Sequence, residues 1–232
     1  MRILFEASTS YDLKERLANA DISVPARSEG RTTDDVERWD MAYLLSCLLQ
    51  AGLLTFPVKL IHRDRPDFLL VMGNKNIGLE HTEAVPQNEA RKEFLREKNN
   101  GLKTWFISPV SPDEPPKSRQ ELMREIEENN HGDGWEGSSP EIAWTEAMLH
   151  FVRHKLGITR KAGYDRFDEN WLLIYNNWSL PALNIRKVSS TFFQGVKDSG
   201  ALQEFDRIFI IKSKVFCDVS ATGVTVLNVR DF

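Results

Sequence analysis

Two short apolar segments separated by a tight turn constrain the fold of this chain more than any other feature. Phe68–Met72 and Ile77–Glu83 flank the turn sequence Gly73-Asn-Lys-Asn76. Apolar runs of this length around a Gly- and Asn-containing turn predict an antiparallel β-hairpin. The chain therefore contains at least one well-defined sheet segment, and acidic residues lie at both of its ends.

The expected pairing of this hairpin brings three polar residues together. If the turn is centred on Asn74 and Lys75, Met72 pairs with Ile77 and Asp67 lies opposite Thr82. Glu80 is then the diagonal neighbour of Asp67, about 7–8 Å away between backbones. Since side chains alternate along a strand, all three polar residues share one face.

Burial decides what these carboxylates can do. Each face of the hairpin carries apolar residues, as expected for the centre of an α/β sheet. A solvated hairpin face is the alternative, but two half-buried carboxylates are costly without a compensating cation or hydrogen bonds. Asp67 and Glu80 are therefore predicted to bind a divalent metal ion.

The sequence of this segment resembles the motif of the PD-(D/E)XK nuclease superfamily. Pro66-Asp67 matches the "PD" of that pattern and Glu80 its second acid, while Thr82 stands where the superfamily usually has lysine. The resemblance extends from Thr33 to about Lys212. It implies an α/β fold with a mixed central β-sheet flanked by helices, in the αβββαβ order of restriction endonucleases.

The resemblance also implies an activity. Asp67 and Glu80 would hold Mg²⁺ or Mn²⁺, and a metal-activated water would hydrolyse a phosphodiester bond of DNA or, less in keeping with the superfamily, RNA. Thr82 cannot replace the lysine, because its hydroxyl carries no charge. Another lysine must then act at the site, with Lys59, Lys155 and Lys161 as candidates, or the protein is a weak or inactive nuclease that binds nucleic acid or protein.

Two further sets of residues are candidates for the site. Glu37, in a predicted helix from Thr33 to Gln50, stands where relatives use an acid as an extra metal or water contact; the alternative is a partner of the helix dipole. A basic segment predicts nucleic-acid contacts, with helix C-terminal capping as its alternative; it comprises Arg153, Lys155, Arg160 and Lys161. Tyr164 and Trp171 are candidates to stack on a base, or else belong to the core.

Composition excludes several classes of protein. The net charge of −4 argues against a globally basic nucleic-acid binder, although a local basic groove is compatible with it. Cys47 and Cys217 are predicted to be free buried thiols of a cytoplasmic protein. No segment approaches membrane-spanning length, so no membrane association is expected.

The remaining pattern predicts one domain over residues 1–232. A Pro-, Gly- and Asn-rich stretch at 109–140 predicts an insertion or flap, and a short strand is expected at Thr104–Ser108. Alternating helices and strands from Ser139 to Lys212 predict parallel crossovers, followed by a C-terminal hairpin. The sequence gives no sign of oligomeric state; many superfamily members are dimers because two strands need two sites, so a homodimer is one expectation. A phosphohydrolase acting on a small nucleotide is a third functional alternative.

Overall fold

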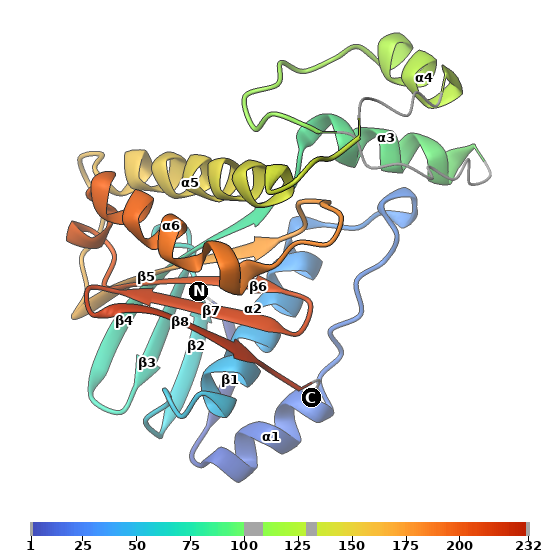
Figure 1. The fold of residues 1–232 in the computed structure, drawn as a ribbon. Helices are drawn as coiled ribbons and strands as arrows, with labels where there is room; N and C mark the ends of the chain where they lie inside the picture. The colour runs from blue at the N-terminus through green and yellow to red at the C-terminus, as the bar shows by residue number, and fades with distance from the viewer. Residues whose placement is uncertain (1, 100–108, 129–133, 231–232) are drawn as a thin grey trace.

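The computed structural model describes residues 2–99, 109–128 and 134–230. These residues form an eight-stranded sheet, six α-helices and two 3₁₀ turns (Figure 1). The N-terminal half contains β1 (Arg2–Ala7), α1 (Ser10–Ala18), η1 (Arg27–Glu29), α2 (Thr33–Gln50), β2 (Val58–His62), β3 (Phe68–Met72), β4 (Lys75–Ala84) and α3 (Gln87–Lys98). The C-terminal half contains α4 (Arg119–Glu128), α5 (Ser139–Thr159), β5 (Glu169–Asn176), α6 (Ile185–Asp198), η2 (Ala201–Gln203), β6 (Arg207–Lys212), β7 (Val215–Ser220) and β8 (Gly223–Asn228).

The sheet is mixed, and its spatial order follows the chain from β1 to β8. The central strands β4, β5 and β6 are parallel, whereas the neighbouring pairs on both sides are antiparallel. Parallel neighbours require crossover connections, which α5 and α6 supply. The predicted α/β class, the parallel pairings and the final hairpin β7–β8 are confirmed.

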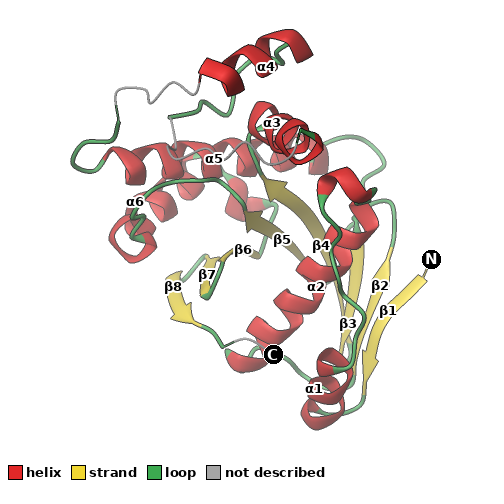
Figure 2. Cartoon of the chain, turned by 90° about the vertical axis from the view of Figure 1, so that its right-hand side faces the viewer, coloured by secondary structure: helices red, strands yellow, loops and turns green. Residues whose placement is uncertain are grey.

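Helices cover the sheet on two sides, with a hydrophobic core on each (Figure 2). Helices α1 and α2 pack on one face through Leu13, Leu44 and Leu48, and helices α5 and α6 pack on the other through Met148 and Phe192. The start of α2 is fixed by a capping box: Thr32 accepts a hydrogen bond from the Asp35 amide, and Asp35 accepts one from the Thr32 amide. Strand β4 is therefore buried on both faces.

The register of the β3–β4 hairpin differs from the prediction. Met72 pairs with Lys75 rather than Ile77, so the turn lies at Gly73-Asn74, and Gly73 adopts a positive φ of 61°. Glycine adopts this backbone conformation without a steric penalty, which favours the turn one residue earlier. Extending the observed register by one residue sets Asp67 level with Glu80, not with Thr82. A shift of two residues preserves the faces, so the predicted shared face of the two acids is unaffected.

The described part of the predicted insertion at 109–140 contains helix α4, which lies at one side of the molecule. Helix α4 packs on α3 through a small separate cluster of Leu95, Leu122 and Ile126 (Figure 1). The predicted strand Thr104–Ser108 and part of the predicted Gly- and Asn-rich loop lie outside the described residues. Division of the chain into one domain with an insertion stays a prediction.

Three smaller expectations have structural outcomes. Cys47 and Cys217 are both buried and free, as predicted. The sequence pattern predicts a helix at about Ser190–Ser199. Helix α6 begins five residues earlier, at Ile185, because the side chain of Asn184 caps it by accepting a hydrogen bond from the Lys187 amide. Within the described ranges, no helix combines the length and the apolar character needed to cross a bilayer. Cytoplasmic localisation stays a prediction.

Gly78 provides a test of the packing beside the two acids. A Cβ at this position would lie 2.7 Å from Cδ2 of Phe167 and 3.1 Å from Cγ of Pro66. We expect Gly78→Ala to lower the free energy of unfolding by about 1–3 kcal/mol, as overpacking of a filled interior does. Gly157→Ala is the control: that helical glycine faces open space, so alanine should raise stability by roughly 0.5–1 kcal/mol. Urea unfolding measures both, and equal stabilities of the two variants would contradict the packing described.

Candidate functional site

The two predicted acids lie on neighbouring strands, on the sheet face that α5 covers. Glu80, in the middle of β4, is 2% exposed, whereas the Asp67 side chain, just before β3, is 26% exposed. The backbone amide of His81 donates a 2.8 Å hydrogen bond to Oδ2 of Asp67. This bond fixes the Asp67 carboxylate against β4, beside Glu80.

Lys155 of α5 joins the two carboxylates. Its Nζ donates to Oε2 of Glu80 at 2.6 Å and to Oδ2 of Asp67 at 2.8 Å. Lys155 is itself 9% exposed, so this is a buried ion pair between the helix and the sheet. One ammonium group therefore holds both acids of the predicted metal site.

The charge state of Lys155 follows from its surroundings. Burial opposes the ammonium, but the carboxylates of Asp67 and Glu80 and their hydrogen bonds outweigh burial and raise the pKa of Lys155 above its usual value. Lys155 is therefore a cation at neutral pH. It can stabilise negative charge but cannot act as a general base there.

Tyr164 completes the contacts of Glu80. Its hydroxyl donates a 2.8 Å hydrogen bond to Oε1 of Glu80, the carboxylate oxygen that Lys155 does not contact. Burial and the adjacent Glu80 carboxylate raise the pKa of Tyr164, so the phenol keeps its proton and remains a donor. Both oxygens of Glu80 thus have a partner from the α5 end of the fold.

Neither Thr82 nor Lys59 joins this cluster. Thr82 shares the face of Glu80 but lies two residues farther along β4, where it lines a cavity. Lys59 of β2 pairs instead with Glu6 of β1 at 3.3 Å. Among the described residues, no hydrogen bond or ion pair links either side chain to Asp67, Glu80 or Lys155.

Glu37 lies beneath the sheet, on the side covered by α2. It faces His62 with 3.3 Å between Oε2 and Nε2. Burial raises the pKa of Glu37, the two nearby histidines oppose this rise, and the charge of Asp67 adds to it. Glu37 is therefore close enough to Asp67 for their charges to interact, but its contact is His62 rather than the two acids.

His81 is a buried histidine that contacts Asp40. Its Nε2 lies 2.7 Å from Oδ2 of Asp40, and both residues are buried. Burial raises the pKa of Asp40, and the hydrogen bond from His81 opposes that rise. This pair lies below β4, on the face opposite Glu80.

The predicted nucleic-acid contacts divide into two groups. Lys155 points into the site, so it is not a surface phosphate contact, whereas Arg153 and Lys161 are exposed and Arg160 pairs with Glu204 at 3.4 Å. Trp171 is 2% exposed and packs edge to face on Phe209, so it is a core residue that cannot stack on a base. Nucleic-acid binding by Arg153, Arg160 and Lys161 stays a prediction.

The donor set of the site suits a hard divalent cation. Asp67 and Glu80 offer carboxylate oxygens that already share one cation, and Oδ1 of Asp67 has no hydrogen-bond partner among the described residues. Within the same residues, no three His, Cys, Asp or Glu side chains are arranged to hold a metal. Mg²⁺ commonly uses only one or two carboxylates and completes its shell with water and substrate phosphate, so the two acids fit it.

The helical spacing of α5 contains a sequence signal for the burial of Lys155. Lys155 falls within the buried stripe of α5 formed by Met148, Val152, Leu156 and Thr159. A lysine at core spacing in a helix needs a buried acid as its partner. Tyr164, in contrast, follows the helix in a loop, and no periodicity could connect it to Glu80.

Comparisons with known proteins add no relative to these observations. No protein-family model, curated protein or solved structure matches the chain. The argument for function therefore depends on the geometry of the site.

Removing Lys155 should reveal how strongly Glu80 depends on it. Lys155→Met leaves a buried carboxylate without its cation, and such a loss costs about 3–5 kcal/mol of unfolding free energy. The double variant Lys155→Met, Glu80→Gln should recover part of that loss, because no buried charge is left unpaired. Lys59→Met, which removes the lysine of an exposed pair, is the matched control and should change stability little. Denaturant unfolding measures the free energy of unfolding of the four proteins. Equal losses of stability in Lys155→Met and Lys59→Met would refute the buried pair.

Loss of the tyrosine hydroxyl should have a smaller effect of the same kind. Tyr164→Phe removes one donor from the buried Glu80, and an unsatisfied buried acceptor costs about 1–3 kcal/mol. Tyr11→Phe, which removes an exposed hydroxyl bonded to Glu15, should leave the melting temperature almost unchanged. A Tyr164→Phe protein as stable as wild type would show that the bond to Glu80 is not formed in solution.

Proposed function

We propose that this protein is a metal-dependent phosphodiesterase that cleaves nucleic acid with a site of the PD-(D/E)XK kind. The single observation that carries the proposal is the contact of one lysine ammonium with two carboxylates on neighbouring strands. That trio has the composition of the superfamily site, with Lys155 of α5 in the role that a lysine of β4 usually has.

The order of elements supports the same assignment. Helix α2, strands β2, β3 and β4, helix α5 and strand β5 follow one another as αβββαβ, with α3 and α4 inserted before α5. The acids stand on the second and third of these strands. A restriction-endonuclease-like core is therefore compatible with the topology, although many α/β proteins share its general class.

Each residue of the site has a defined part in this proposal. Asp67 and Glu80 would hold the metal ion, with the His81 amide fixing Asp67 and the Tyr164 hydroxyl fixing Glu80. Lys155 supplies positive charge where negative charge develops on the phosphate. Such pre-formed contacts reduce the reorganisation needed during the reaction, because the groups are already oriented in a buried site.

The metal would supply the nucleophile. A bound Mg²⁺ or Mn²⁺ lowers the pKa of a coordinated water and offsets charge on the phosphate. This contribution is needed because Lys155 is protonated at neutral pH and Tyr164 retains its proton, so neither can remove a proton from water. DNA is the substrate that the superfamily resemblance favours.

One observation favours a second function, a nucleic-acid-binding module without hydrolysis. Lys155 and Tyr164 already give both oxygens of Glu80 a partner, so the buried acid is satisfied without a metal ion. A protein that needed only the fold would keep such a cluster for stability. Metal dependence separates the two functions.

Cleavage assays test the proposal directly. With Mn²⁺ or Mg²⁺ present, wild-type protein should cleave single- or double-stranded DNA or RNA, and Asp67→Asn or Glu80→Gln should lose about 100-fold or more of the rate, equivalent to at least two steps of 1.36 kcal/mol in the barrier. The metal ions should also raise the melting temperature of wild type but not of these variants.

Glu6→Gln is the matched control, since Glu6 also pairs with a lysine between neighbouring strands. It should cleave and respond to metal like wild type. Absence of both cleavage and metal-dependent stabilisation in the wild-type protein, together with retained DNA binding in a gel shift, would replace the hydrolase with the binding module.

A further inference from the structure

A cavity of about 720 Å³ lies beside the last part of β4, where His81, Thr82 and Glu83 line it; Asp67 and Glu80 lie outside this lining. Thr82 lies in its wall, two residues after Glu80, which is about 7 Å along a strand. The other walls come from the η1 segment, the start of α2, and helices α3 and α4. This volume falls within the range of about 300–1,000 Å³ that is typical of small-molecule sites.

The charge of this cavity is opposite to that of the whole chain. Five cationic side chains line it, against two carboxylates, Glu37 and Glu83; the cations are Arg27, Arg31, Arg91, Lys98 and Arg119. The chain as a whole carries a net charge of −4. The cavity therefore favours an anionic ligand that the rest of the surface would repel.

One face of α3 supplies both charged and apolar walls. Arg91, Phe94, Leu95 and Lys98 are spaced i, i+3, i+4 and i+7, so they lie on one side of the helix. Lys98 Nζ stands 4.7 Å from the centre of the Phe94 ring. An aromatic ring with a cation beside it is the combination that stacks on a base and pairs with its phosphate.

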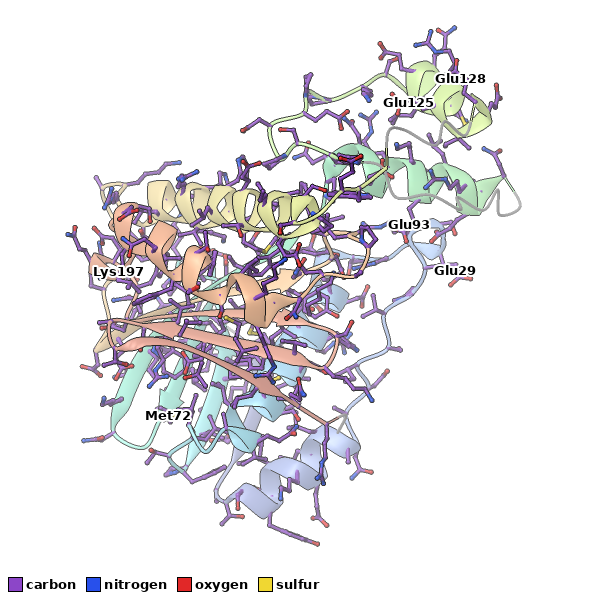
Figure 3. The ribbon with its side chains drawn as sticks, viewed as in Figure 1. Glu29, Met72, Glu93, Glu125, Glu128 and Lys197 are labelled. Atoms are coloured by element: carbon purple, nitrogen blue, oxygen red, sulfur yellow. The ribbon has the colours of Figure 1, made fainter. Side chains whose placement is uncertain are left out.

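The cations differ in how fully they are already bound. Arg27 pairs with Glu93 at 2.7 Å and Arg31 with Glu83 at 3.3 Å, which holds the η1 segment against α3 and β4; Figure 3 shows Glu93 of α3 facing the segment that carries Glu29. Arg119 is exposed at the start of α4 and has no carboxylate partner among the described residues. Arg91 donates a 2.6 Å hydrogen bond to the carbonyl of Lys117, which leaves its charge unpaired within the described ranges. Arg91, Lys98 and Arg119 are therefore the cations with charge available to a ligand.

We propose that this cavity receives one unpaired nucleotide of a single-stranded substrate, next to the phosphodiester bond held at Asp67 and Glu80. The proposal rests on the proposed function, since it places the neighbour of the bond to be cut. The base stacks on Phe94 against the apolar wall, and its phosphate pairs with Lys98 and Arg119. A nucleotide within a duplex cannot place its base against Phe94 inside this cavity without leaving its stack.

Binding without divalent metal tests this independently of cleavage. In EDTA, fluorescence anisotropy with a labelled single-stranded DNA of about 12 nucleotides should give a dissociation constant about tenfold higher for Phe94→Leu than for wild type, because base stacking on an aromatic ring is lost. Lys98→Gln and Arg119→Gln should each lower the slope of log K against log salt by about 0.7, the value for one phosphate contact on a single strand. Leucine keeps the apolar packing of Phe94, and melting temperatures verify that each variant is folded.

The chain offers a matched control on α6. Lys197 lies over Phe193 with the same four-residue spacing, 5.6 Å from the ring centre, on the other side of the molecule (Figure 3). Phe193→Leu and Lys197→Gln should bind the strand like wild type. A blunt duplex of the same length should bind at least tenfold more weakly than the single strand and should be insensitive to Phe94→Leu.

Several results would overturn the proposal. The first is wild-type affinity for the single strand in Phe94→Leu and Lys98→Gln. The second is duplex binding as tight as single-strand binding and equally sensitive to Phe94→Leu. The third is displacement of the strand by a free mononucleotide at a concentration near the strand's dissociation constant. Glu80→Gln should bind at least as tightly as wild type, since it removes a negative charge near the phosphate. The binding measurement does not depend on cleavage, so different results would contradict the two proposals.

Discussion

The buried contact between Glu80 and Lys155 is the interaction on which the rest of the site depends. A carboxylate that is 2% exposed on a central strand can remain ionised only if a cation and hydrogen bonds compensate for its lost hydration. Lys155 and Tyr164 provide that compensation from α5 and the loop after it, and Asp67 shares the same ammonium. The contact also fixes the rotation of α5 on the sheet, because only one face of the helix can present a lysine to β4. Packing and chemistry are therefore set by the same few side chains.

That dual role has a consequence for metal binding. The ammonium of Lys155 occupies the charge position between two carboxylates that a divalent cation would also seek, so the ion must share the acids with Lys155. Carboxylates have about four lone-pair sites each, which makes sharing chemically feasible. The partial exposure of Asp67 gives solvent and ions access to its carboxylate. Access through Asp67, with Glu80 held from within the fold, is the arrangement that the burial of the two residues dictates.

Sequence reasoning located the acids but left the lysine among three candidates, Lys59, Lys155 and Lys161, of which Lys155 contacts the acids. Strand periodicity is two, so a register error of two residues moved Asp67 from Glu80 to Thr82 without exchanging faces, and the shared face survived the error. The position of Gly73 at a positive φ, which decides the register, depends on a local turn preference. The helices, the parallel crossovers and the buried cysteines follow from patterns within single segments. The pairing of Lys155 with Glu80 joins residues 75 positions apart, and Lys59, a closer candidate along the chain, is bound to Glu6 instead.

Helices α3 and α4 determine the charge around the site. Their small separate cluster around Leu95 and Leu122 anchors α4 on α3 without drawing on either sheet core. The outer helices can therefore carry arginines and lysines that would be unfavourable within the main body, and they bring these charges to the end of β4. Glu83 and Glu93 neutralise Arg27 and Arg31 where the η1 segment meets this pair, which leaves the charge of α3 and α4 directed into the cavity. An acidic chain thereby acquires a local positive site near Asp67 and Glu80, which is the electrostatic condition that the proposed nuclease function requires.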